Sequence, residues 1–192
     1  MNAAGKLRVG IVVGSTRPGR KSASVAEWVD GIAQGRESAE YETVDLENFA
    51  LPHLDEELPA AYGRYAHPHT IRWARRVDEF DGFVFVTPEY NHGIPGALKD
   101  AIDFVYAEWG NKAAGFVSYG VAGGVRAVEQ LRLNLATVPA TVALSLAADF
   151  ADGAVHPSDG QATALTDVLD GVETWARALA PLRSATESAD AA

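Results

Sequence analysis

The segment from Gly14 to Ser22, Gly-Ser-Thr-Arg-Pro-Gly-Arg-Lys-Ser, combines the residue types that bind a phosphate group. Its glycines allow a tight turn and a close approach of the backbone to a ligand. Its hydroxyl groups and the free N–H groups of a following helix offer hydrogen bonds, and its basic side chains add positive charge. The residues that could hold an anion here are Ser15, Arg17, Arg20, Lys21 and Ser22.

This segment only partly matches the phosphate loop GxxxxGK[ST] of nucleoside triphosphatases. Gly14 and Gly19 have the right spacing, but Arg20 and Lys21 stand where that motif has Lys and then Ser or Thr. The apolar run at 82–87 also ends without an acidic residue that could hold magnesium. A nucleoside triphosphatase is therefore disfavoured, and a solvated turn without a ligand is the structural alternative.

A second segment, Pro88 to Gly96, has the composition expected around a flat aromatic ligand. Its prolines, its glycines and Tyr90 provide rigid walls and expose backbone N–H and C=O groups to the polar edge of such a ligand. Glu89 and His92 are candidates for proton transfer. The favoured alternative is that Glu89 satisfies neighbouring backbone groups and His92 covers the rim of the site.

A third segment, residues 118–124, is rich in glycine and could line the other side of a planar ring. Ser118, Asp149 and His156 follow the chain order of an α/β-hydrolase triad. However, Phe116 occupies the position of the first Gly in the nucleophile motif GxSxG, which disfavours a hydrolase.

The elements that position these segments follow from the alternation of short apolar runs with amphipathic stretches, which predicts an α/β fold with a parallel sheet. Strands are expected at 7–13, 40–46, 82–87, 113–118 and 140–146. Helices are expected at 22–34, from 70 to about 80, at 96–106, at 125–136 and around 165–179. Each of the three segments follows a strand, and ligands of open parallel sheets bind beyond the carboxyl ends of strands.

Composition limits the class of protein. The chain has 192 residues, with 16 Lys and Arg against 26 Asp and Glu, a formal net charge of −10 and a pI of about 4.9. This length predicts one domain, placed at 1–182, and the composition from Arg183 onward predicts a disordered tail at 183–192. The excess of acidic residues argues against nucleic-acid binding.

The absence of cysteine excludes disulfides, thiolate nucleophiles and Cys-ligated metals. His67 and His69 could chelate a metal, but no third ligand is apparent and a surface loop is favoured, so no metal site is predicted. The apolar run from Val9 to Val13 is too short for a signal peptide and predicts a buried strand. We therefore expect a cytoplasmic protein with no membrane partner.

Two segments, GSTRPGRKS at 14–22 and PEYNHGIPGALKDAIDF at 88–104, resemble the NAD(P)H-dependent FMN reductase family. This flavodoxin-like group also contains quinone, azo and chromate reductases, and the resemblance covers nearly the whole chain. It implies a three-layer α/β sandwich with a five-stranded parallel sheet in the order 2-1-3-4-5.

The resemblance also implies three groups of FMN contacts. The phosphate is expected to be held by Ser15, Arg17, Arg20 and Ser22. The isoalloxazine ring is expected to be lined by Pro88, Glu89, Tyr90 and Asn91. Its other side is expected to be closed by Ser118, Tyr119, Gly120 and Gly123. The chain departs from many relatives at Ser24, His92, Gly93 and Phe104, and because of the substitutions at 92 and 93 the resemblance does not define the substrate side of the pocket.

The implied activity is transfer of hydride from NADPH or NADH to bound FMN, and then of electrons to a small acceptor. The acceptor could be a flavin, a quinone, an azo compound or a metal oxyanion. Because the cofactor carries the chemistry, no side chain is assigned as catalytic. The resemblance further implies a homodimer or homotetramer. The alternative from another class is a non-catalytic flavodoxin-like electron carrier.

Overall fold

Five parallel strands form the central sheet of the structure, a computed structural model that describes residues 5–190 and the side chains of residues 5–183. The strands are β1 (Leu7–Val13), β2 (Ala39–Asp45), β3 (Gly82–Pro88), β4 (Ala113–Gly120) and β5 (Ala136–Ser145). Their spatial order is β2-β1-β3-β4-β5. This order confirms the expected flavodoxin-like α/β class.

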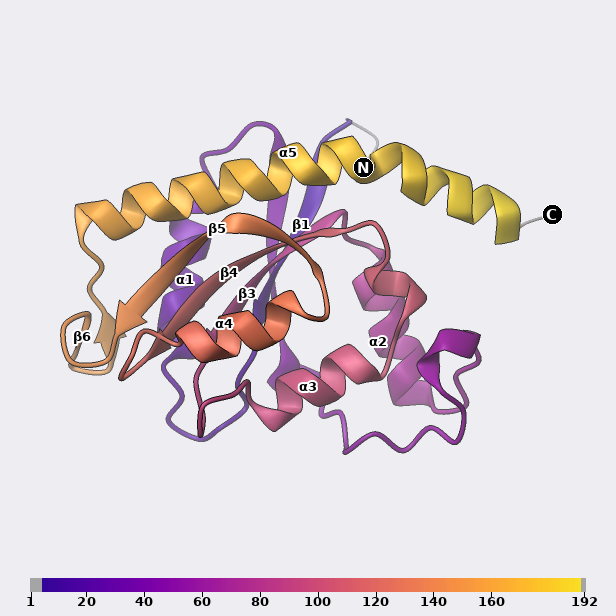
Figure 1. The fold of residues 1–192 in the computed structure, drawn as a ribbon, viewed down its shortest axis with the longest axis horizontal. Helices are drawn as coiled ribbons and strands as arrows, with labels where there is room; N and C mark the ends of the chain where they lie inside the picture. The colour runs from indigo at the N-terminus through magenta and orange to yellow at the C-terminus, as the bar shows by residue number, and fades with distance from the viewer. Residues whose placement is uncertain (1–4, 191–192) are drawn as a thin grey trace.

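Helices cover both faces of the sheet. They are α1 (Ser22–Ala33), α2 (Pro68–Asp78), α3 (Gly96–Asp103), α4 (Val125–Arg132) and α5 (Asp159–Asp190). The helices α1 and α5 pack on one face, and α2, α3 and α4 pack on the other (Figure 1). The remaining elements are the 3-10 helices η1 (Leu46–Asn48), η2 (Ala60–Tyr62) and η3 (Ala107–Trp109), and a hairpin of β6 (Phe150–Ala151) and β7 (Ala154–Val155).

The central strands are apolar at successive positions because each strand buries both of its faces. In β1, Val9 and Ile11 belong to the core beneath α1 and α5, whereas Val12 belongs to the core beneath α2, α3 and α4. In β4, Gly115 allows α5 to approach the sheet, since a Cβ at this position lies only 2.6 Å from Val168. The middle strands are therefore held rigidly, and their carboxyl ends have fixed positions.

The boundary between α4 and β5 differs from the sequence-based expectation. The helix ends at Arg132 rather than at 136, and the strand begins at Ala136 rather than at 140. Pro139 lies inside this strand, which stands at the edge of the sheet, and the register with β4 shifts between Ala114 and Phe116. Edge strands and bulges are where proline is tolerated, so Pro139 does not end the strand.

The last helix also differs in length. It continues past Arg183 to Asp190, within the segment 183–192 for which a disordered tail is expected. The guanidinium group of Arg183 pairs with the Asp81 carboxylate at 2.7 Å and donates to the backbone oxygen of Asn111. The expected boundary at 182 therefore does not coincide with the end of an element, and residues 191 and 192 lie outside the described part.

Three smaller boundary differences bear on the site. The helix α2 begins at Pro68 rather than at 70, α3 ends at Asp103 rather than at 106, and β4 extends through Tyr119 to Gly120. Within residues 5–190, no helix is long and apolar enough to cross a membrane.

Candidate cofactor-binding site

The three predicted segments meet at the carboxyl edge of the sheet. The hydroxyl groups of Ser15 and Tyr90 lie 2.9 Å apart and join the first segment to the second. The backbone N–H of Glu89 donates to the Tyr119 carbonyl at 3.1 Å and joins the second segment to the third. The loops after β1, β3 and β4 therefore lie against one another.

The first loop leaves β1 through a tightly packed glycine. The N–H of Gly14 donates to the Val86 carbonyl at 2.9 Å, and a Cβ on Gly14 lies 2.9 Å from the Leu98 side chain. Gly19 adopts a left-handed conformation with φ of +70°, and the N–H of Arg20 closes a turn on the Arg17 carbonyl. The chain thus turns sharply into the N-terminus of α1, whose first residue is Ser22.

Two buried hydroxyl groups at this turn have no hydrogen-bond partner of good geometry among the described residues. They are Ser22 Oγ, from the start of α1, and the phenol oxygen of Tyr119, from the end of β4. Burial raises the pKa of Tyr119 to about 12, against the opposing influence of the neighbouring Ser22 and of Arg17. Leaving such groups unsatisfied costs on the order of 1–3 kcal/mol each, so this place suits a ligand rich in hydrogen-bonding oxygens.

The basic side chains of the first loop are placed differently from one another. Arg17 is exposed, lies over the Tyr90 ring at 5.5 Å and makes no ion pair among the described residues. The Lys21 ammonium lies 5.2 Å from the centre of the Phe150 ring. Arg20, which is also expected on the phosphate, pairs with Asp45 at 2.5 Å and Glu47 at 2.7 Å, and 12% of its side chain is exposed. In this arrangement Arg20 ties the loop to the end of β2.

The second loop contains a tight turn from Tyr90 to Gly93. Tyr90 and Gly93 exchange two backbone hydrogen bonds of 2.9 and 3.0 Å. The two central residues, Asn91 and His92, are exposed and have φ values of +48° and +68°. Left-handed conformations are uncommon for residues other than glycine and cluster at functional sites, where the surrounding structure holds them.

Glu89 has a structural partner. Its carboxylate accepts hydrogen bonds from the backbone N–H of Arg126 at 3.0 Å and from the Arg126 guanidinium at 2.6 Å, and 8% of its side chain is exposed. Burial acts to raise the pKa of the Glu89 carboxyl, but the interactions with Arg126 outweigh burial and hold that pKa below its usual range. This geometry favours the interpretation of Glu89 as a support for the backbone at the start of α4.

The third loop is held by Ser118 and by its glycines. The Ser118 hydroxyl is buried and donates to the Gly123 carbonyl at 2.7 Å, so it points into the loop. A Cβ on Gly124, which has φ of +77°, lies 2.7 Å from Ser118 Cβ. The Asp149 carboxylate accepts from the backbone N–H of Ser145, at 2.6 Å. Ser118 and Asp149 are thus engaged with backbone groups rather than with each other, and the hydrolase interpretation has no support.

The two histidines that could chelate a metal lie at the start of α2. The rings of His67 and His69 stack with their centres 5.2 Å apart, and His69 Nε2 lies 3.0 Å from an Asp55 carboxylate oxygen. Among the described residues, no cluster of three His, Cys, Asp or Glu side chains is arranged to hold a metal ion.

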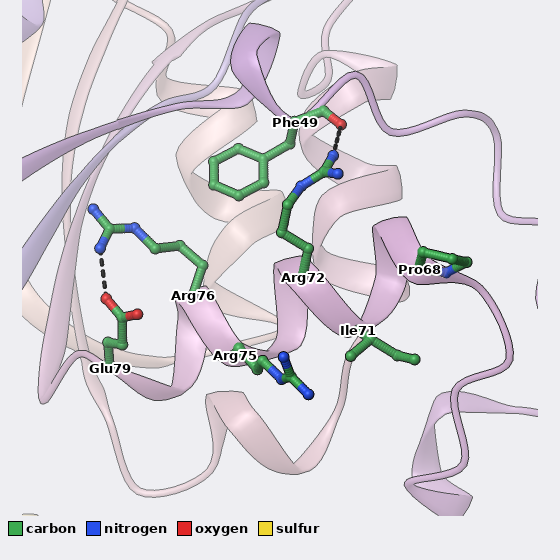
Figure 2. A pocket seen from close by; sticks show the side chains of 7 residues that line it. All are labelled: Phe49, Pro68, Ile71, Arg72, Arg75, Arg76 and Glu79. Atoms are coloured by element: carbon green, nitrogen blue, oxygen red, sulfur yellow. Dashed lines mark hydrogen bonds and ion pairs between the residues drawn. The ribbon is translucent and has the colours of Figure 1, made fainter.

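A separate pocket of about 470 Å³ lies on the outer face of α2 (Figure 2). It is lined by Phe49, Pro68, Ile71, Arg72, Arg75, Arg76 and Glu79. Two of its arginines have protein partners, since Arg72 donates to the Phe49 carbonyl at 2.8 Å and Arg76 pairs with Glu79 at 2.6 Å. No residue of the three strand-end loops lines this pocket, so it is not part of the candidate site.

Sequence reasoning missed Arg126 and Gln130, which lie one turn apart on α4 and contact the loop that follows β3. Neither residue belongs to a motif. Each of them is more than 35 residues away in sequence from the residue that it contacts. These contacts therefore depend on how α4 packs against the sheet, which no local sequence pattern predicts.

Comparisons with known proteins agree with this architecture. The family model described as NADPH-dependent FMN reductase matches residues 7–153. An NAD(P)H-dependent FMN reductase from Schizosaccharomyces pombe is 37% identical over 156 residues, which cover 77% of this chain and 78% of the relative. A quinone reductase from Escherichia coli is 34% identical over 145 residues, which cover 71% of this chain and 73% of the relative.

A solved structure gives the same result. The flavoenzyme NAD(P)H:(acceptor) oxidoreductase FerB from Paracoccus denitrificans superposes with a TM-score of 0.66 at 26% identity, covering 89% of this chain and 97% of that one. The resemblance found in the sequence and the oxidoreductase class that it implies are confirmed. This chain belongs to the NADPH-dependent FMN reductase family.

Proposed function

We propose that this protein binds FMN at the carboxyl edge of its sheet and uses NADPH or NADH to reduce a small-molecule acceptor. The observation that carries the proposal is the pair of buried hydroxyl groups of Ser22 and Tyr119, which have no hydrogen-bond partner of good geometry among the described residues. They lie near the N-terminus of α1, as does Arg17, which is exposed and makes no ion pair within the described part of the chain. A phosphate monoester supplies the oxygens that these hydroxyls lack, and helix N-termini favour anions.

In this proposal the first loop binds the phosphate. Ser22, the N-terminal N–H groups of α1 and the Arg17 guanidinium donate to phosphate oxygens, and Lys21 contributes charge at the rim. Arg20 acts indirectly, because its ion pairs with Asp45 and Glu47 fix the shape of the loop. Ser15 serves a similar purpose through its contact with the Tyr90 hydroxyl.

The second and third loops bind the ring in this proposal. Pro88 and the turn from Tyr90 to Gly93, with Asn91 at its tip, present rigid backbone groups to one edge of the isoalloxazine. Gly120 and Gly123 have no side chains to fill the space on the other side, and Ser118 holds the Gly123 carbonyl in place. Glu89 remains ionised and anchors α4, so it is not assigned a proton-transfer role.

Bound FMN supplies the redox chemistry, accepting hydride from a reduced nicotinamide and passing electrons onward. The protein's contribution is to orient the ring and to leave one face open for nicotinamide and acceptor in turn. The relatives are described as FMN and quinone reductases, so we propose a free flavin or a quinone as the acceptor class, ahead of azo compounds and metal oxyanions.

We also propose that the chain forms a homo-oligomer in the cytoplasm. The family resemblance supports the homo-oligomer, and so do the exposed apolar side chains of Val121, in the third loop, and Val125, at the start of α4. Light scattering of the purified protein measures the mass of the assembly directly. A monomer at micromolar concentration contradicts the proposal.

The function is tested by mixing FMN-loaded protein with NADPH or NADH without oxygen, and then adding a quinone. We expect the visible flavin absorbance to bleach within seconds and to return when the quinone is added. A flavin that neither nicotinamide reduces indicates a carrier that exchanges electrons with protein partners. A protein that takes up no FMN overturns the proposal altogether.

A further inference from the structure

Helix α4 contacts the loop after β3 on both sides of its tight turn. Before the turn, Glu89 accepts hydrogen bonds from Arg126 in the first turn of α4. After the turn, the backbone N–H of Ile94 donates to the side-chain carbonyl oxygen of Gln130 at 2.9 Å. Arg126 and Gln130 are four residues apart and therefore lie on the same face of the helix.

The exit of the turn is shaped to receive the Gln130 side chain. A Cβ on Gly93 lies 3.0 Å from Gln130 Oε1, so glycine lets the carboxamide come close to the backbone. Ile94 and Pro95 are buried directly after this contact. The Gln130 hydrogen bond therefore attaches the chain at the point where it leaves the turn and enters the core.

The turn depends on attachments of this kind because its conformation is strained. Asn91 and His92 both have positive φ, and both side chains are exposed, so packing of these side chains does not hold them. Strained backbone of this type persists where surrounding groups determine it. The reciprocal hydrogen bonds between Tyr90 and Gly93 close the turn, but they do not fix its direction relative to the sheet.

We infer that Gln130 is a positioning residue for the flavin site. Its side chain holds the turn from Tyr90 to Gly93 in place by accepting a hydrogen bond from the Ile94 N–H. The inference rests on the proposed function for its link to flavin. Gln130 reaches the site through the backbone of the turn and needs no contact with the cofactor. Gln130 keeps the backbone N–H and C=O groups of the turn oriented toward the flavin ring.

The test compares three variants of the full-length protein. Gln130→Met has a similar shape but lacks the acceptor, whereas Gln130→Glu keeps an acceptor oxygen. Glu129→Gln is the matched control, because Glu129 lies next to Gln130 on α4, has 74% of its side chain exposed and pairs only with Arg132 in the described structure. Two quantities are measured: amide hydrogen exchange in peptides covering 90–97 without FMN, and the FMN dissociation constant by fluorescence quenching.

For Gln130→Met we expect exchange in 90–97 to accelerate and the FMN dissociation constant to rise, each by roughly three- to tenfold, the effect of one lost neutral hydrogen bond. Gln130→Glu and Glu129→Gln are expected to stay within about twofold of the wild type. Peptides from α1 and α5 are expected to exchange at the wild-type rate. A general loss of stability would instead accelerate exchange in these helices as well.

Unchanged exchange in 90–97 for Gln130→Met overturns the inference, and so does equal acceleration in α1 and α5 or a failure of Gln130→Glu to restore the wild-type value. The exchange measurement needs no flavin. If the wild-type protein binds no FMN, the proposed function fails, while exchange still decides whether Gln130 holds the turn.

Discussion

Replacing Glu89 with glutamine separates a structural role of this carboxylate from a chemical one. The carboxylate is nearly buried and accepts two hydrogen bonds from Arg126, one of them from the backbone at the N-terminus of α4. Glutamine keeps one acceptor oxygen but presents an NH2 group to the second donor of Arg126, and losing that one hydrogen bond costs about 1 kcal/mol. The ion pair adds about another 1 kcal/mol after discounting, because 49% of the Arg126 side chain is exposed to solvent.

The two contributions predict that Glu89→Gln lowers the free energy of unfolding by about 2 kcal/mol at pH 7. For a protein of this size, this loss corresponds to a fall in melting temperature of roughly 4–8 °C. The pKa of Glu89 is below its usual range, so its stabilisation is complete above the unfolded-state pKa of about 4.3 and is lost as the pH falls through the lower folded value. The difference between variant and wild type is therefore expected to shrink below that pH.

Thermal melting followed by circular dichroism at pH 7 and pH 4 measures both effects, with Glu129→Gln as the exposed control on the same helix. Flavin reduction by NADPH is measured on the same samples at a temperature where both proteins are folded. A Glu89→Gln variant that melts within about 1 °C of the wild type, yet reduces flavin more than about tenfold more slowly, refutes the capping role and assigns Glu89 to the chemistry.

Further substitutions test other parts of the site and fold. Arg17→Ala is expected to weaken FMN binding by roughly ten- to a hundredfold in a fluorescence titration, the value of a lost charge-assisted contact of about 1.5–3 kcal/mol; unchanged retention of FMN removes Arg17 from the phosphate site. Arg20→Ala is expected to lower the melting temperature and to affect FMN binding less than Arg17→Ala, since its guanidinium is paired with carboxylates; the same titration ranks the two. Gly124→Ala is expected to destabilise the protein by about 3 kcal/mol in urea unfolding, because its Cβ overlaps Ser118 and its φ is positive; a loss below about 1 kcal/mol contradicts the packing described for this loop. Burial lowers the pKa of Lys112 to about 8, so the free energy of unfolding of the wild type is expected to rise between about pH 8 and the unfolded-state pKa of about 10.5. Between pH 7 and pH 10 the free energy of unfolding is expected to rise by about 2 kcal/mol more in the wild type than in Lys112→Met. Equal pH dependence of the two proteins contradicts a buried ammonium group.

The strands can be predicted from the sequence where both of their faces are buried. The strands β1, β3 and β4 are buried at almost every position and appear as mostly apolar runs, so their starts at Leu7, Gly82 and Ala113 are predicted correctly. The edge strand β5 carries exposed residues and Pro139, so its first four residues resemble the end of a helix and the beginning of a loop. Its position is set by pairing with β4, which no local pattern encodes.

The sequence predicts the location of the candidate site better than it predicts the roles of the individual residues. Three glycine-containing loops after buried strands predict where a ligand binds, because chain order and strand polarity bring them to one edge. The roles of Arg20 and Ser118 depend on partners elsewhere in the fold, namely Asp45 at the end of β2 and the Gly123 carbonyl. A side chain that can bind a ligand can equally bind its own backbone or a neighbouring carboxylate, and only the packed structure distinguishes the two.

Adding FMN to the flavin-free wild-type protein, and then NADPH or NADH under anaerobic conditions, shows whether the three strand-end loops bind a flavin that nicotinamide reduces. We expect saturable quenching of FMN fluorescence, followed by bleaching of the bound flavin within seconds of nicotinamide addition. Fluorescence that stays unquenched at every FMN concentration contradicts the claim that the three strand-end loops form a flavin site.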